Sequence, residues 1–332
     1  MNTLTMKWLL RREFWEHKGS MFWAPAIVSA LLVLLVGGTL IYGLATHGAP
    51  GFVHVNGQTM SHGAFAAAMP AETREMVSRV ASGMYLAAGA PLFIILAGVV
   101  FFYCLGALYD ERRDRSILFW KSLPVSDATT VLSKVITALC VAPVIVLVLD
   151  VIASLALLFI GTLGLSLNGI HLFGTLLTQP DLYLQPLRLL ALLPVYAIWA
   201  LPTIGWLLLV SSWAKTKPFL WAVGVPLIVL LLVKWISYTL ENFSGMPLNI
   251  MPVAQEVVAR LLGGSVPGIW FSFTEGIPAA IRESARDQGP DMGALFEASW
   301  MTLLTVQAWI GALAGAAMIF AAMRLRRWRD EG

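Results

Sequence analysis

The chain has 332 residues, of which 58% are hydrophobic and only 12% are charged, and its formal net charge is +3. A soluble domain carries about 25% charged residues, so this composition excludes an ordinary soluble domain and predicts a membrane protein. The small positive charge gives no reason to expect nucleic acid as a partner, because membrane topology accounts for the basic residues.

The first twenty residues predict an amphipathic helix. Trp8, Trp15 and Phe22 recur every seven residues, with Leu4 one turn earlier, and the charged side chains lie off that line. We expect this helix to lie at the inner membrane interface. It serves either as a juxtamembrane anchor alone or as a docking element for a partner.

Six apolar stretches are long enough to cross a bilayer, because about 30 Å of hydrocarbon needs roughly 20 helical residues. The expected spans are 22–44, 84–108, 134–163, 188–212, 218–240 and 298–323. Residues 1–332 are therefore predicted to form a single transmembrane domain of the all-α polytopic class. With the N-terminus inside, 15 of the 22 Lys and Arg residues fall in cytoplasmic segments. The positive-inside rule then places both termini on the cytoplasmic side of the cytoplasmic (inner) membrane.

Residues 109–133 form the only sizeable cytoplasmic loop between predicted spans, and they contain the densest charge cluster of the chain. Phe119 and Trp120 follow the charged run; Pro124 then ends one short helix, and Ser126 caps the next, with Asp127 in its first turn. A short exposed helix with an aromatic pair favours insertion into a groove of another protein. The alternative is a charged loop that only fixes topology.

One acidic and one basic residue, Asp150 and Lys234, lie inside the predicted spans. At 1.5 Å per residue, Asp150 and Lys234 each lie about 24 Å from the inner boundary, where an unpaired charge is costly. They form a candidate intramembrane charge pair that holds an outer gate shut. The alternative is that Lys234 snorkels to the interface while Asp150 is protonated or bonded to Ser154.

Pro, Gly and short apolar stretches alternate through residues 241–297, which predicts re-entrant or interfacial helices at the outer face, before the last span. Trp270 and Phe271 suit the interface, and we expect them to line a candidate exit region together with Glu275. The alternative is a surface helix that only caps the bundle. In the last span, Gly311 and Gly315 form a G-x-x-x-G motif that allows close helix packing, either within one subunit or between two.

The stretch DERRDRSILFWKSLPVSDATTVLSK, residues 110–134, resembles the cytoplasmic loop of ABC-2 type permeases, the membrane subunits of one large class of ABC exporters. Six spans, an N-terminal interfacial helix and a re-entrant region before the last span are also what that family implies. Asp114-Arg115-Ser116 departs from the Gly-Thr of many relatives, and 45–83 is longer than the minimal family pattern, which leaves subfamily and substrate open. The resemblance implies a cytoplasmic coupling helix that contacts the ATPase through Arg115, Ile117, Leu118, Phe119, Trp120, Lys121, Leu123 and Pro124.

Enzyme signatures are missing from the sequence. There is no G-x-x-x-x-G-K-[ST], H-E-x-x-H, G-x-S-x-G or C-x-x-C, so we expect no catalytic, cofactor-binding or metal-binding residues in this chain. The resemblance implies separate ABC ATPase subunits that hold ATP and Mg, and a second permease copy in a homodimer or heterodimer. Membrane lipid is the remaining expected partner.

The expected function is that of a permease subunit that couples ATP hydrolysis to export of an amphipathic substrate, such as a lipid, peptide or drug. One alternative is a non-transporting membrane subunit that uses ATPase closure for mechanical signalling or for gating a partner. A secondary transporter is less favoured, because such carriers usually show ionisable groups in several spans and broken helices.

Overall fold

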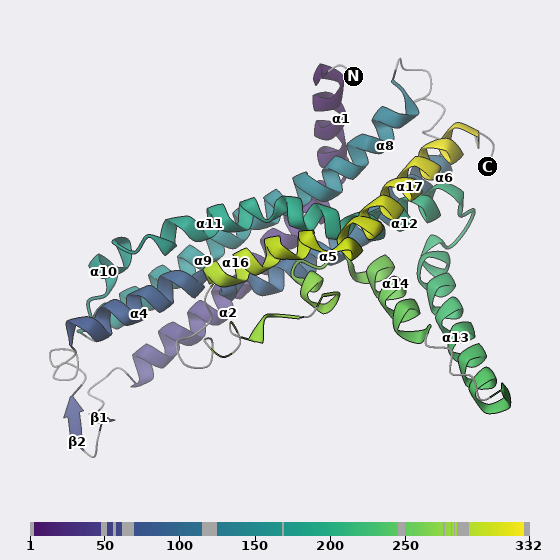
Figure 1. Cartoon of the computed structure of the whole chain (residues 1–332). Helices are drawn as coiled ribbons and strands as arrows, with labels where there is room; N and C mark the ends of the chain where they lie inside the picture. Colours follow the sequence, from purple (N-terminus) through teal and green to yellow (C-terminus); the bar gives the residue numbers. More distant parts are fainter. Residues whose placement is uncertain are drawn as a thin grey trace.

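The computed structural model describes residues 3–47, 52–55, 58–61, 70–114, 125–167, 169–244, 250–274, 276–279, 281, 283 and 292–328. Helices dominate this part of the chain (Figure 1). The α-helices are α1 Thr3–Glu16, α2 Ala24–His47, α4 Ala71–Met84, α5 Ala90–Gly106, α6 Tyr109–Arg113, α8 Asp127–Ile136, α9 Ala142–Leu167, α10 Phe173–Leu177, α11 Asp181–Ala191, α12 Leu193–Trp213, α13 Pro218–Ser244, α14 Met251–Gly263, α16 Met292–Met301 and α17 Val306–Trp328. The 3₁₀ helices are η2 Tyr85–Gly89, η4 Ile269–Ser272 and η5 Thr302–Leu304, and the π turns are η1 Gly19–Trp23 and η3 Thr137–Val141.

The described residues also contain one small departure from the predicted all-α class. Strand β1, Phe52–Val55, pairs antiparallel with β2, Gln58–Ser61, so that Phe52 lies opposite Ser61. The two strands lie beyond the end of α2, at the end of the molecule away from both chain termini (Figure 1). Because the pair is short and peripheral, the fold remains that of a helical bundle.

Six continuous helical runs are long and apolar enough to cross a membrane, as predicted from the lengths of the apolar stretches. The chain is therefore a multi-pass membrane protein. The runs are Gly19–Gly43, Ala71–Arg113, Asp127–Leu167, Asp181–Trp213, Pro218–Phe243 and Val306–Trp328.

The second run is much longer than its predicted span, 84–108. Its 43 residues correspond to a length of about 65 Å at 1.5 Å per residue. Its first 14 residues, α4, include four charged side chains and pack against α10 and α11. An apolar-length criterion ends where these charges begin, and that is why the predicted span starts at 84.

The last run begins eight residues later than the predicted start at 298. The helix is broken at Thr302–Leu304, and Thr305 is extended. The Thr302 hydroxyl donates to the Ser299 carbonyl oxygen at 2.6 Å, and the Thr305 hydroxyl donates to the Thr302 carbonyl oxygen at 2.7 Å. Local side-chain to backbone hydrogen bonds of this kind compete with the regular helix ladder, so α16 and α17 are separate helices.

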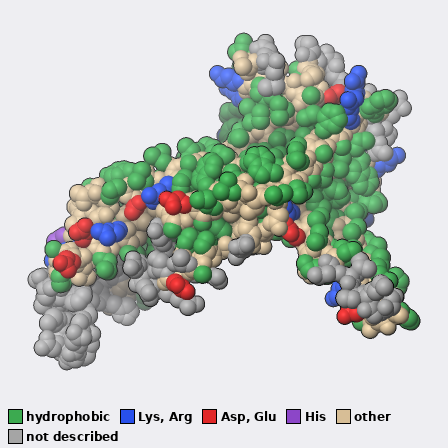
Figure 2. Space-filling model, viewed as in Figure 1, with side chains coloured by type: hydrophobic (Ala, Val, Ile, Leu, Met, Phe, Trp, Pro, Cys, Tyr) green, Lys and Arg blue, Asp and Glu red, His purple; other side chains and the backbone are tan. Residues whose placement is uncertain are grey.

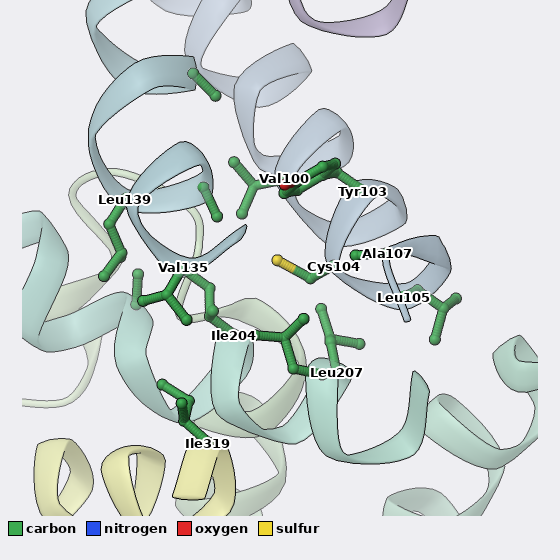
Figure 3. Close-up of a cluster of buried hydrophobic side chains, with 14 of the residues drawn as sticks. Val100, Tyr103, Cys104, Leu105, Ala107, Val135, Leu139, Ile204, Leu207 and Ile319 are labelled. Atoms are coloured by element: carbon green, nitrogen blue, oxygen red, sulfur yellow. The ribbon is translucent and has the colours of Figure 1, made fainter. Parts of the chain in front are cut away.

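The centre of the bundle is formed by α5, α8 with η3, α12 and α17. Side chains from these elements point toward one another in Figure 3, and those labelled are Val100, Tyr103, Cys104, Leu105, Ala107, Val135, Leu139, Ile204, Leu207 and Ile319. Helices α12 and α17 pack closely against each other. A Cβ on Gly315 would lie 2.5 Å from the Leu201 carbonyl group and 2.8 Å from the Pro202 nitrogen. Gly315 is therefore required where the two backbones meet.

Two groups of helices diverge from this centre (Figure 1). One contains α2, α4, α9 and α11, and the other contains α13 and α14. Much of α2 and α13 is covered by exposed apolar side chains, as expected for helices that face lipid. Figure 2 shows hydrophobic side chains over the middle of the visible face, with Lys and Arg at the upper end, beside both termini, and also on the two diverging groups of helices.

Helix α1 confirms the predicted N-terminal helix, but its packing face is not the tryptophan line. Trp8 and Trp15 are exposed, whereas Met6, Leu9 and Glu13 are buried against α8. The π turn η1 then joins α1 to α2, and the π turn η3 joins α8 to α9 in the same way. Each π turn adds an extra residue within an otherwise continuous helix, a feature that is frequent near functional sites.

Candidate coupling site

The predicted coupling residues Arg115, Ile117, Leu118, Phe119, Trp120, Lys121, Leu123 and Pro124 lie outside the described residues. Both ends of the segment 115–124 are described, because α6 ends just before it and α8 begins just after it. At the second end the prediction of a helix cap is confirmed. The Ser126 hydroxyl oxygen accepts a hydrogen bond from the Thr129 backbone N–H at 3.2 Å, and Asp127 occupies the first turn. This cap fixes where α8 starts.

Four buried charged side chains meet beside these two ends, and we call them the ionic hub: Glu13, Glu111, Lys134 and Arg326. The Lys134 ammonium lies 3.0 Å from Glu13 Oε1 and 3.0 Å from Glu111 Oε1. The Arg326 guanidinium lies 2.6 Å from Glu111 Oε2. None of the four is more than 5% exposed. The hub is electrically balanced, since two carboxylates face two cations.

Further polar groups surround the ionic hub. The Tyr103 hydroxyl donates to Glu13 Oε2 at 2.8 Å. Arg326 Nε donates to Asp127 Oδ1 at 3.1 Å, and the Arg12 guanidinium lies 3.6 Å from Glu111 Oε1. Asp127 is part-exposed, so the network of charged side chains reaches from the interior to the surface at the start of α8. Buried charges need this many partners, because desolvation costs several kcal/mol per ion.

The hub joins four segments that are far apart in sequence. Glu13 comes from α1, Glu111 from α6, Lys134 from α8 and Arg326 from α17. Two of these residues, Glu111 and Lys134, flank the segment 115–124 on either side, and the other two lie near the chain termini. A displacement at either end of that segment therefore acts on α1 and α17 through charged contacts.

A second set of contacts holds the same end of the bundle to α12. The Arg112 guanidinium donates to the Ser211 carbonyl oxygen at 2.7 Å and to the Ala214 carbonyl oxygen at 2.9 Å. The Ser211 hydroxyl oxygen accepts from the backbone N–H groups of Leu108 and Tyr109. These hydrogen bonds hold α6 against the C-terminal end of α12.

His17 lies at the edge of the site. Its ring packs edge-on against the Tyr103 ring, with centroids 4.9 Å apart. Burial lowers the pKa of His17 below its ordinary value of 6.5, the Glu13 carboxylate opposes this shift, and the Lys134 ammonium adds to it. The neutral imidazole is therefore favoured beside the ionic hub.

The predicted gate pair is not formed. Asp150 is fully buried in α9, accepts a hydrogen bond from the Ser154 hydroxyl at 3.2 Å and packs directly against Gly89. Lys234 is exposed on α13, in the other group of helices (Figure 1). No ion pair joins the two among the described residues, and the packing agrees with the alternative in which Ser154 holds Asp150 and Lys234 extends outward. The prediction was wrong because it considered only depth in the membrane: two residues at equal depth in different spans need not be neighbours.

Two of the three predicted exit residues, Trp270 and Phe271, lie among the described residues, with ring centroids 6.1 Å apart. Trp270 is buried, not interfacial as expected, and its indole N–H donates to the Ser299 hydroxyl oxygen at 3.1 Å. Phe271 is half-buried and lines a cavity, while Glu275 lies outside the described residues. The G-x-x-x-G residues are used within the chain, since Gly315 meets α12 and Gly311 meets the Arg260 side chain.

No protein-family model, curated protein or solved structure matches the chain. The residues of the site themselves indicate what it can do. They link the two ends of one loop to both terminal helices. The arrangement is suited to transmitting a displacement between that loop and the bundle.

Proposed function

We propose that this chain is the permease subunit of an ABC exporter of the ABC-2 type, and that segment 115–124 receives the movement of a separate ATPase. One observation carries the proposal: the ionic hub binds Glu111 and Lys134, on the two sides of that segment, into the same network as α1 and α17. A partner that pushes on the loop would therefore move the first, second, third and last spans together.

The division of labour follows from this arrangement. The ATPase partner holds ATP and Mg, and two copies of the permease chain carry two such partners on the cytoplasmic face of the inner membrane. The positive charge gathered beside both termini agrees with this orientation. The proposed substrate is amphipathic, such as a lipid, peptide or drug, as the resemblance of the cytoplasmic loop led us to expect.

The test is to purify the tagged chain from its native membranes and to measure ATP hydrolysis in the purified material, with and without added lipid, peptide or drug. We expect an ATPase that copurifies and responds to at least one of these. Phe119→Ala combined with Trp120→Ala should lose it, since truncation of a buried aromatic anchor costs about 2 kcal/mol or more, roughly 30-fold in affinity.

The matched control replaces two aromatic residues outside the loop. Trp8→Ala with Trp15→Ala removes exposed aromatic side chains from α1 and leaves the loop intact, so the ATPase should remain bound. Glu111→Gln should keep the ATPase but lose its stimulation, because only the hub is altered. Absence of any ATPase from the wild-type preparation, or normal activity in the Phe119 and Trp120 double variant, would contradict the proposal.

A further inference from the structure

Arg260 is a buried cation at a distance from the ionic hub. It lies on α14, which turns back from the end of α13 and packs between α13 and α12. The C-terminal end of α14 is inserted deeply: a Cβ on Gly264 would lie 2.7 Å from the Trp199 carbonyl oxygen and 2.7 Å from the Thr203 hydroxyl. Arg260 itself is 7% exposed, and its guanidinium packs directly on Gly311 of α17.

The hydrogen-bonding capacity of Arg260 is only partly used. Nη1 donates to the Gln307 carbonyl oxygen at 2.9 Å, and the Glu256 carboxylate is 3.7 Å away. The guanidinium carbon lies 4.6 Å from the centre of the Trp199 ring and 5.7 Å from that of Phe273. Nε and Nη2 are buried and have no hydrogen-bond partner among the described residues. Aromatic faces stabilise the charge, but they accept no in-plane N–H bond, so two strong donors remain available.

A cavity of about 700 Å³ lies beside this arginine. Phe273 and Gln307, which both contact Arg260, form part of its wall, and so does Thr302, whose hydroxyl oxygen accepts the Trp199 indole N–H at 3.1 Å. The remaining wall is largely apolar and includes Phe271 and Met301. The volume suits a small ligand, and a mostly apolar wall with few polar groups is typical of such sites.

We propose that this cavity binds an amphiphile with an anionic head, a phosphate or a carboxylate, and that Arg260 binds that head. The apolar wall takes the apolar part of the ligand, while Nε and Nη2 supply charge-assisted hydrogen bonds. Phe273 and Gln307 separate the guanidinium from the open volume, so binding moves the Phe273 ring aside.

This inference names the substrate class of the proposed exporter. The binding site stands on its own observations, and only the ligand's role as the exported substrate rests on the proposed function. Its test uses the isolated full chain without any ATPase. Failure here therefore leaves the coupling proposal standing, and failure of the coupling proposal leaves the binding site standing.

The experiment is calorimetric titration of the purified chain, held in phosphatidylcholine nanodiscs, with dioctanoyl phosphatidylglycerol, dioctanoyl phosphatidylcholine, octanoate and inorganic phosphate. We expect saturable binding of phosphatidylglycerol about tenfold tighter than of phosphatidylcholine, since a charge-assisted hydrogen bond is worth that factor or more. Arg260→Gln should reduce the preference below about twofold. Arg188→Gln, which removes an outward pairing with Asp181, should leave it unchanged.

A second variant guards against misfolding of Arg260→Gln. Val306 lines the cavity and is 72% exposed, so Val306→Trp narrows the cavity without disturbing the core, and binding should fall at least tenfold with Arg260 intact. Octanoate binding that Arg260→Gln abolishes would assign the head to a carboxylate as well as a phosphate. Equal affinity for both phospholipids, inorganic phosphate binding as tightly as phosphatidylglycerol, or unchanged binding in Val306→Trp would overturn the proposal.

Discussion

Replacing Lys134 with Met should be among the most destabilising single changes at the site. The side chain is 2% exposed, and its ammonium lies 3.0 Å from a carboxylate oxygen of both Glu13 and Glu111. A Met side chain fills most of the volume of the apolar part of Lys134, so the expected loss of stability is mainly electrostatic. Glu13 would keep only its hydrogen bond from Tyr103, at 0% exposure. Removing one partner of a buried ion pair costs about 3–5 kcal/mol, because the remaining charge stays desolvated and unpaired.

The measurement is the free energy of unfolding in mixed micelles, by denaturing detergent titration. Lys7→Met on α1 is the matched control, because Lys7 is exposed and its loss should change stability by no more than about 0.5 kcal/mol. The double variant Lys134→Met with Glu13→Gln should recover part of the loss, since the net charge of the hub is again balanced by Glu111 and Arg326. A loss below about 1 kcal/mol in Lys134→Met, or a double variant worse than the sum of the single ones, would refute this account.

Two further predictions concern helix packing and pH. Gly315→Ala should destabilise the bundle by about 1–3 kcal/mol, because its Cβ would meet the α12 backbone at Leu201, whereas Gly38→Ala, in open space, should be neutral; equal effects in detergent unfolding would exclude the close contact. Stability should fall as pH is lowered below 6.5, since the pKa of His17 is depressed and the unfolded chain then binds the proton more readily. His17→Phe should flatten that pH dependence between about pH 5 and 7, and an unchanged slope would assign it to other groups.

Composition and apolar length were sufficient to predict six membrane-spanning helices, since a bilayer imposes one length on all of them. The Ser126 cap was also predictable, because its signal is local in sequence. The predicted boundaries at 84 and 298 were wrong. A helix with charged side chains, α4, extends the second run toward its N-terminus, and hydrogen bonds from threonine hydroxyls break the last predicted span.

The ionic hub could not be predicted, because Glu13 and Arg326 come together only through packing of the first and last helices. A weak signal existed: Glu13 follows Met6 and Leu9 at spacings of three and four residues, which places a carboxylate on an apolar stripe. The more conspicuous tryptophan line on the same helix is exposed and gave no information about the face that packs against α8. The alternation of Pro, Gly and short apolar stretches predicts re-entrant or interfacial helices over 241–297, where α14 lies, but it does not indicate that Arg260 would be buried between α14, α12 and α17.

The two π turns determine how the hub residues are oriented. Glu13 and Lys134 each lie just before one of these turns, at Gly19–Trp23 and Thr137–Val141. Each residue of a regular helix rotates the chain by about 100°. A regular helix through 137–141 has no place for the extra residue that the π turn holds, so it would turn Lys134 by about that angle relative to the rest of its span. The ammonium would then leave the buried face while every side chain of the hub was still present in the sequence. Helical phase, as much as residue identity, is what keeps these charges together.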